Sequence, residues 1–247
     1  MSHRYYLATE LSVGARPSLD GTEAHHLLNV MRAKPGHAIE IFDGNGQQAD
    51  AVVVSSTRKE VQVEILNVQT ANRLPQRRIV IAAAAPKGDR LRFLLEKLTE
   101  LGAVAWLPLE TQHSVNALNP STLRKANQWV IDACKQSQRN HLLDILPPVP
   151  LEELLGKPPL ATTGWIATAP RDQLAERFVE TFANNDASAA YDHIVLVGPE
   201  GGFSEAEQNA AQDAGYQPWH LGQLVLRIET AAVAALVAAV QAEATPA

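Results

Sequence analysis

Three charged side chains near the C-terminus are the residues best suited to chemistry: Glu200, Arg227 and Glu229. Glu200 lies in the glycine-rich stretch 198–202, and the other two interrupt an apolar stretch. Charged side chains in such surroundings are seldom fully buried unless they are paired. The sequence therefore leaves two alternatives, a functional site that uses these groups, or a structural ion pair of Arg227 with Glu229 or with Glu200.

The glycine-rich stretch lies in a pattern of strand, tight loop and helix. Residues 193–197 are short, apolar and mostly β-branched, which predicts a buried strand. The three glycines and one proline in 198–202 permit positive φ angles and a close approach of the backbone to a ligand. Ser204 and Glu207 fit a capping box that starts a helix. A tight turn without any ligand would have the same pattern, so both interpretations stay open.

This loop does not match the common phosphate-binding loops. A Walker loop needs a lysine after its last glycine, and none follows here. The spacing also differs from the Gly-x-Gly-x-x-Gly fingerprint of dinucleotide-binding folds. Since the carboxylate of Glu200 would repel a pyrophosphate, a neutral or cationic ligand suits the loop better.

The second apolar stretch, residues 221–230, precedes a segment of unusual composition. Residues 230–242 are almost entirely alanine and valine. A helix that is apolar on every side is normally buried, and about 13 residues are too few to span a bilayer. We therefore expect either a core helix or a subunit interface, with Ala235 in the contact between two copies.

Length and composition indicate a globular protein of one large or two smaller domains. The chain has 247 residues, of which 46% are apolar, and a net charge of −6. The acidic balance argues mildly against a nucleic-acid partner. A local basic cluster argues the other way; it consists of Arg73, Arg77, Arg78, Lys87, Arg90 and Arg92. One cysteine, no zinc-binding spacing and no signal peptide in residues 1–10 lead us to expect a cytoplasmic protein without metal.

The pattern of elements changes near residues 70–76, where we place a domain boundary. Residues 1–70 predict closely spaced strands with one helical insert, typical of a small β-barrel. The expected elements are a helix through His25, Leu28 and Met31, strands at 38–42, 49–55 and 60–68, and a hairpin turn at 43–46. Residues 76–247 alternate strand and helix, which predicts an α/β domain with a mainly parallel sheet. Its expected strands are 79–85, 104–109, 164–168 and 193–197, and its helices 89–101, 120–138 and 172–182.

The residues 195–204 and 221–231, taken together, resemble the ribosomal RNA small subunit methyltransferase E family. This family belongs to the SPOUT class of RNA methyltransferases, which use S-adenosylmethionine. Residues 26–36, 87–102 and 133–139 fit the same family in the same order. The resemblance implies a PUA-like RNA-binding barrel in 1–70, and in 76–247 a SPOUT-type α/β sheet with a C-terminal trefoil knot.

The resemblance also implies an activity, the methylation of N3 of a uridine in 16S ribosomal RNA of the small subunit, by a homodimer. Arg227 would stabilise the uridine anion, and Glu229 or Glu200 would orient Arg227 or act as the base. The implied cofactor-binding residues are Thr168, Ala169, Val197, Gly198, Gly201, Leu221, Gly222 and Leu226. The candidate RNA contacts are Arg4, Arg32, Arg92 and Arg139.

The chain departs from the family pattern at Leu224, Ile228 and His113, where arginine, threonine and arginine are usual. These departures weaken any basic groove built from those positions. Two other functions stay open at this point. One is a non-catalytic RNA-binding protein of the same fold. The other is an acid/base hydrolase that uses Glu200 and Glu229, although the sequence offers it no well-placed nucleophile or metal.

Overall fold

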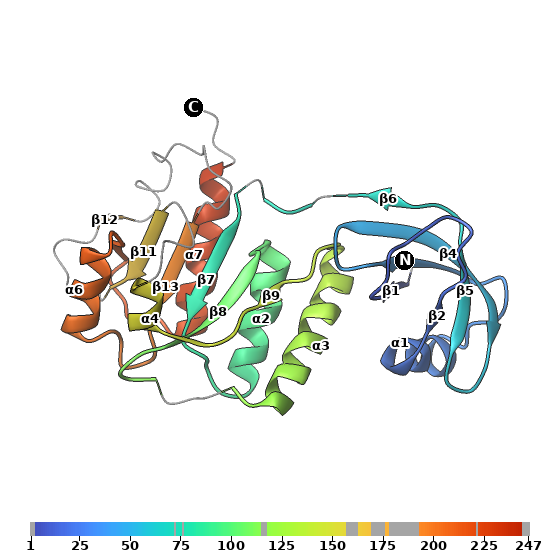
Figure 1. Cartoon of the computed structure of the whole chain (residues 1–247), viewed down its shortest axis with the longest axis horizontal. Helices are drawn as coiled ribbons and strands as arrows, with labels where there is room; N and C mark the ends of the chain where they lie inside the picture. Colours follow the sequence, from blue (N-terminus) through green and yellow to red (C-terminus); the bar gives the residue numbers. More distant parts are fainter. Residues whose placement is uncertain are drawn as a thin grey trace. The chain divides into compact units, whose positions relative to one another are not determined.

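The chain folds into two compact units (Figure 1). The computed structural model describes residues 3–71, 73–75, 77–114, 118–156, 163–168, 176–177, 193–220 and 222–243. The first unit comprises Met1–Arg73 and Cys134–Leu142, and the second comprises Leu74–Ala133 and Leu143–Ala247. The division at residue 73 falls within the predicted boundary region. The segment Cys134–Leu142 differs from the prediction, which had placed it in the second domain.

The first unit is built on a mixed, mainly antiparallel sheet. The strands pair in the order β1-β3-β4-β5-β2, and β6 pairs with β4. They are β1 (Arg4–Tyr6), β2 (Ser18–Leu19), β3 (Ala38–Phe42), β4 (Gln47–Ser56), β5 (Val61–Ile65) and β6 (Gln69–Thr70). Alternate residues of β5 are buried, as the sequence alternation predicts. The predicted helix is a short α1 (Gly21–His25) that continues as a π-helical turn, His26–Val30.

The predicted hairpin turn between β3 and β4 is confirmed. The Asp43 carboxylate accepts hydrogen bonds from the backbone N–H groups of Asn45 and Gln47, at 2.7 and 3.0 Å. Gly46 has a φ of +108°, and a Cβ on it would lie 2.6 Å from the His141 ring. Glycine is therefore required here for its backbone angle and for the close approach of the segment Cys134–Leu142.

The second unit is an α/β domain around a parallel sheet, as predicted. Its strands pair in the order β10-β8-β7-β13-β11-β14-β12, with β9 beside β8, and every pairing is parallel. The strands are β7 (Ile79–Ala83), β8 (Ala105–Glu110), β9 (Asp144–Ile145), β10 (Val149–Pro150), β11 (Thr163–Ala167), β12 (Glu176–Arg177), β13 (His193–Val197) and β14 (Gln217–His220). Every residue of β7 and β13 is buried, which is typical of central strands covered on both faces.

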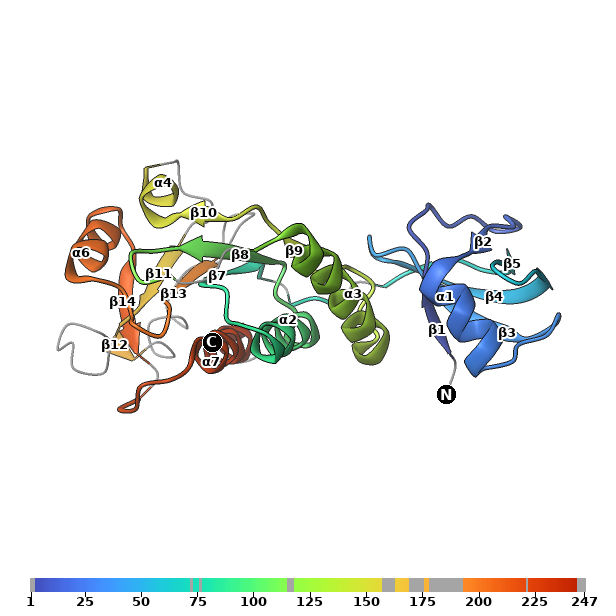
Figure 2. The same ribbon diagram turned by 90° about the horizontal axis from the view of Figure 1, so that it is seen from below.

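Helices cover both faces of this sheet (Figure 2). On one face α2 packs against α7, and α7 against β7 and β13. On the other face, residues of α4 and α6 share an apolar core with alternate residues of the strands. The helices are α2 (Asp89–Leu101), α3 (Pro120–Ser137), α4 (Leu151–Leu155), α6 (Glu205–Asp213) and α7 (Ile228–Glu243). Within the described ranges no helix is long and apolar enough to cross a membrane.

Two sequence predictions in this unit were wrong. The helix expected at 172–182 is contradicted by its two described residues, Glu176–Arg177, which form β12 and pair with β14; the other residues of that range lie outside the description. Ala235, expected in a contact between two copies, is fully buried in the core of its own chain. Only one side of α7 is covered, since Val237 remains 38% exposed. The trefoil knot stays a prediction.

Candidate active site

A cavity of about 330 Å³ lies at the carboxyl ends of β13, β11 and β14, which are neighbours in the sheet. Ligands of open α/β folds bind at this end of the strands. The cavity is lined by residues of three loops and by the start of α7. They are Ala167, Thr168, Val197, Gly198, Pro199, Glu200, Gly201, Gly202, Phe203, Trp219, His220, Gly222, Leu224, Val225, Leu226, Ile228 and Ala231.

The loop 198–203, which follows β13, forms one wall of this cavity. It turns sharply because Gly202 has a φ of +70° and donates its N–H to the Pro199 carbonyl at 2.8 Å. A Cβ on Gly198 would lie 3.1 Å from the Phe203 ring. The predicted capping box is confirmed, because Ser204 and Glu207 bond each other's backbone N–H at the start of α6.

The other walls follow β11 and β14. The backbone N–H and the hydroxyl of Thr168 both donate to the Trp219 carbonyl, at 3.0 and 3.1 Å, and so join the ends of the two strands. Beyond β14, Gly222 has a φ of +111° and its N–H lies 3.3 Å from the His220 ring nitrogen. Two predicted cofactor-binding residues, Ala169 and Leu221, lie outside the described residues. The other six all line the cavity.

The loop between β14 and α7 is exposed, although its sequence is apolar. Leu224 is 79% exposed and Val225 is 83% exposed. Arg227 is exposed as well, and it forms no ion pair with any residue that the structure describes. The structural ion pair that would have explained Arg227 is therefore absent from the described part of the chain. Among the described residues, no carboxylate competes with a ligand for this cation.

Glu200 is paired with a different arginine. Its Oε1 lies 2.7 Å from Nη1 of Arg90, at the start of α2. A hydrogen bond from its own backbone N–H lowers the pKa of the Glu200 carboxyl, and Arg90 and Lys87 lower it further. A lowered pKa makes a weaker base. In the described structure Glu200 thus pairs with Arg90 and not with Arg227, and its lowered pKa makes it a weaker candidate for a general base.

Glu229 lies in the first turn of α7 and is buried. Its Oε2 accepts no hydrogen bond from the described residues. The amino end of a helix stabilises negative charge, so this position suits a carboxylate. Glu229 does not line the cavity itself, but it lies two residues from Arg227.

Comparison with known proteins identifies the family. A family model described as RNA methyltransferase domain matches residues 72–240, and one described as RNA methyltransferase PUA domain matches residues 19–66. A Mycobacterium tuberculosis protein named ribosomal RNA small subunit methyltransferase E is 31% identical, over 94% of this chain and 88% of its own length. The chain belongs to the ribosomal RNA small subunit methyltransferase E family.

Two solved structures are similar to this chain over almost its whole length. The methyltransferase E of Neisseria gonorrhoeae, bound to S-adenosyl methionine, is 32% identical with a TM-score of 0.84. A Legionella pneumophila protein described as a putative methyltransferase in complex with the cofactor SAM is 26% identical with a TM-score of 0.86. Each alignment covers 96% of both chains. The Bacillus subtilis methyltransferase E is 28% identical over 94% of both chains.

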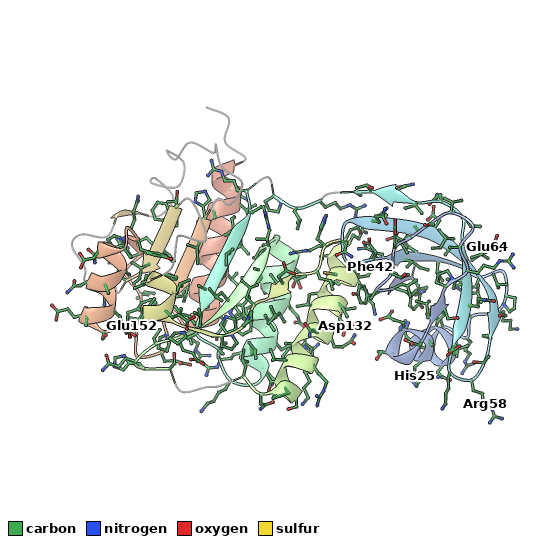
Figure 3. All side chains as sticks on the ribbon, viewed as in Figure 1. His25, Phe42, Arg58, Glu64, Asp132 and Glu152 are labelled. Atoms are coloured by element: carbon green, nitrogen blue, oxygen red, sulfur yellow. The ribbon has the colours of Figure 1, made fainter. Side chains whose placement is uncertain are left out.

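Two of the four arginines that were predicted to contact RNA make contacts within the first unit instead of facing solvent. Arg4 is only 6% exposed; it pairs with Glu40 at 2.8 Å and donates to the Cys134 carbonyl. It also lies 4.4 Å from the centre of the ring of Phe42, which is labelled in Figure 3. Arg139 is buried and donates to the carbonyl groups of His141 and Leu142. Guanidinium groups used in this way present little surface to a phosphate, so these two candidates rank below the exposed ones.

The other two candidate arginines, Arg32 and Arg92, are exposed. Arg92 pairs with Glu96 at 2.7 Å on the surface of α2. Arg32 follows the π-helical turn and has a φ of +50°, one of two positive values among the described non-glycine residues. Such angles cost about 1–3 kcal/mol and gather at functional sites. Arg32 thus stays the better-supported RNA contact.

Sequence reasoning missed several residues of the site. Trp219 and His220 were missed because β14 has only four residues and contains Pro218, so it lacks the pattern of a central strand. Arg90 was seen only as part of a charged cluster. Its pairing with Glu200 joins residues 110 positions apart, and no local pattern predicts such a contact.

We expect Gly201→Val to weaken S-adenosylmethionine binding by several fold. A Cβ on Gly201 would lie 3.1 Å from Cβ of His113, so the larger side chain must displace the loop 198–203. Gly201 does not have a positive φ, and crowding rather than backbone strain is therefore the cause. Isothermal titration calorimetry measures the effect. Gly156→Ala is the control, since its Cβ would make only an ordinary contact; unchanged affinity in Gly201→Val would contradict the placement of the pocket.

Proposed function

We propose that this protein transfers the methyl group of S-adenosylmethionine to N3 of a uridine in 16S ribosomal RNA. The observation that carries the proposal is the cavity at the ends of β13, β11 and β14, in a chain whose relatives of 26% and 32% identity hold this cofactor. The RNA is presented in the small ribosomal subunit or in an assembly intermediate, in the cytoplasm. The proposed methyl-transfer reaction is the same at any stage of ribosome assembly.

The cavity suits S-adenosylmethionine in size and charge. Its volume of about 330 Å³ falls in the usual range for small-ligand sites, about 300–1,000 Å³. The described lining residues include no lysine or arginine, and their one carboxylate, Glu200, is at the mouth where it is half exposed. An apolar wall with one anion favours a cationic sulfonium ligand over a phosphate. Close-approaching glycine backbones offer N–H and C=O groups to an adenine edge.

The reaction needs no nucleophile from the protein. The uridine N3 loses its proton and attacks the methyl carbon, while the carbon–sulfur bond breaks and its electrons stay on a neutral thioether. The protein must hold N3 and the methyl group about 3–3.5 Å apart. The exposed guanidinium of Arg227 stabilises the uridine anion through a carbonyl oxygen. Glu229, buried two residues away, is the remaining candidate for orienting Arg227 or accepting the proton.

The structure gives less support to the two alternative functions, the hydrolase and the non-catalytic RNA-binding protein. An acid/base hydrolase would need Glu200 and Glu229 together, but the lowered pKa of Glu200 and its pairing with Arg90 remove one of them. A non-catalytic RNA-binding protein would not need to keep the cavity, or an exposed Arg227 that no described carboxylate pairs with.

We expect Arg227→Ala to lower kcat about 10²–10³-fold, the usual effect of removing a donor aimed at developing charge. Cofactor affinity should change little, because Arg227 does not line the cavity. Turnover on small ribosomal subunits and calorimetry with S-adenosylhomocysteine separate the two effects. Arg124→Ala, an exposed arginine on α3, is the control. Normal turnover by Arg227→Ala would assign Arg227 a purely structural role.

We expect Arg32→Gly to weaken RNA binding without a loss of stability. Glycine adopts the positive φ of this position freely, so the melting temperature should stay equal or rise. Losing one phosphate contact should reduce the salt dependence of RNA affinity by about one unit of slope. Filter binding of a 16S fragment at several salt concentrations measures both quantities. Arg58→Ala, in the turn between β4 and β5 (Figure 3), is the control. An equal loss of RNA affinity in the two variants would exclude a specific role for Arg32.

The active form, in this proposal, is a homodimer that pairs through the open side of α7. That side carries exposed or half-buried residues, most of them small or apolar, namely Thr230, Val233, Ala234, Val237 and Gln241. It is preceded in the chain by the exposed Leu224 and Val225. Small residues allow two helices to approach closely, and two-fold pairing is the commonest closed assembly. A second copy would cover this surface and lie near each pocket.

Val237→Arg should therefore convert the dimer to a folded monomer with little activity. Ala235→Arg should instead unfold the chain, because that side chain is fully buried in its own core. Light scattering gives the molar mass, and circular dichroism shows whether the fold survives. A wild-type monomer at micromolar concentration with full activity would refute the dimer.

A further inference from the structure

We propose that Arg90 and His113 are positioning residues for cofactor binding, which hold the loop 198–203 from outside the cavity. The inference rests on the proposed cofactor pocket and extends it to two side chains that do not line it. Each of them comes from a different element of the second unit. Each contacts the loop at a different residue.

Arg90 holds the loop at Glu200. It lies in the first turn of α2, which follows β7, and β7 is the neighbour of β13 in the sheet. Since both strands are parallel, their carboxyl-end loops meet at the same edge. Nη1 of Arg90 lies 2.7 Å from Oε1 of Glu200, a distance typical of a charge-assisted hydrogen bond. The turn before α2 is fixed by Gly88, which has a φ of +59°.

His113 holds the same loop at its glycines. It lies in the segment that follows β8, and its Nδ1 is 3.1 Å from the Gly202 carbonyl oxygen. Because that oxygen only accepts, Nδ1 must carry the proton. The ring also lies against Gly201, where an added Cβ would be 3.1 Å from Cβ of His113. The loop therefore cannot move toward His113 without displacing that side chain.

Hydrogen bonds to Glu207 also hold the segment that contains His113 in place. The Glu207 carboxylate accepts the backbone N–H of Gln112 at 2.8 Å through Oε1, and the N–H of Ser204 at 2.8 Å through Oε2. One carboxylate thus joins the segment after β8 to the residue that follows the loop. Together with Arg90, this arrangement restrains the loop at three successive residues, 200, 201 and 202.

Such restraint matters because the loop is rich in glycine. Glycine loses more backbone freedom on ordering than any other residue. Contacts that hold a loop in its binding conformation before the ligand arrives reduce the entropy lost on binding. Arg90 and His113 should therefore raise cofactor affinity without touching the cofactor, and they should do so through Glu200 and Gly202.

Calorimetry with S-adenosylhomocysteine on the full-length protein tests this. Arg90→Ala should weaken binding about 2- to 5-fold, as expected for a partly exposed ion pair. His113→Ala should weaken it about 2- to 10-fold, and His113→Asn, which keeps a donor, should restore most of the loss. In the Glu200→Ala background, Arg90→Ala should have no further effect, because its partner is gone. Lys97→Ala is the control, since Lys97 pairs with Glu100 on the same helix.

Several results would overturn the proposal. Wild-type affinity in Arg90→Ala and His113→Ala would do so. Fully additive effects of Arg90→Ala and Glu200→Ala would show that Arg90 acts by another route, and failure of His113→Asn to recover affinity would remove the role of the hydrogen bond. Arg90→Lys, which keeps the charge, serves if Arg90→Ala does not fold. Absence of binding by the wild type would instead refute the cofactor pocket itself, and this proposal with it.

Discussion

The structure of the second unit depends on one constraint, the parallel alignment of β7, β13, β11 and β14 as neighbours. Parallel strands end at the same edge, so every loop that leaves these carboxyl ends is brought to one place. The central strands can align in this way because they are apolar on both faces and are covered by α2 and α7 on one side and by α4 and α6 on the other. The cavity follows from that arrangement rather than from any single motif.

Charge is distributed around the cavity in a way that fits its proposed ligand. The lining residues are mostly apolar or glycine, and the described basic groups that contact the loop lie outside the lining. Arg90 neutralises Glu200 only in part, since both remain partly exposed. Arg227 stays unpaired at the start of α7 among the described residues. This distribution suits a cationic ligand in the cavity, and in the proposed reaction Arg227 would stabilise the anion that forms on the RNA base.

Local signals predicted those parts of the fold that depend on nearby residues. The bounds of α2 and β13 are confirmed, because Gly102 ends the helix at a φ of +90° and a run of buried residues forms the strand. Contacts between residues that are far apart in the sequence could not be predicted from local patterns. Arg4 was predicted to be a surface arginine that contacts RNA. Its guanidinium instead donates a hydrogen bond to the carbonyl of Cys134, which is 130 positions away in the sequence. Leu224 and Val225 lie in an apolar stretch, yet both are largely exposed in the described structure.

The central claim is that the cavity delivers a methyl group to N3 of a uridine. Small subunits from a strain that lacks this gene would be incubated with the purified protein and S-adenosylmethionine carrying an isotope-labelled methyl group. Nucleosides from the digested 16S ribosomal RNA would then be separated and analysed by mass spectrometry. The account predicts labelled 3-methyluridine, close to one per subunit at completion, and at most about a hundredth of that with Arg227→Ala over the same time. Label in a ribose methyl or another base, or no label at all, would contradict it.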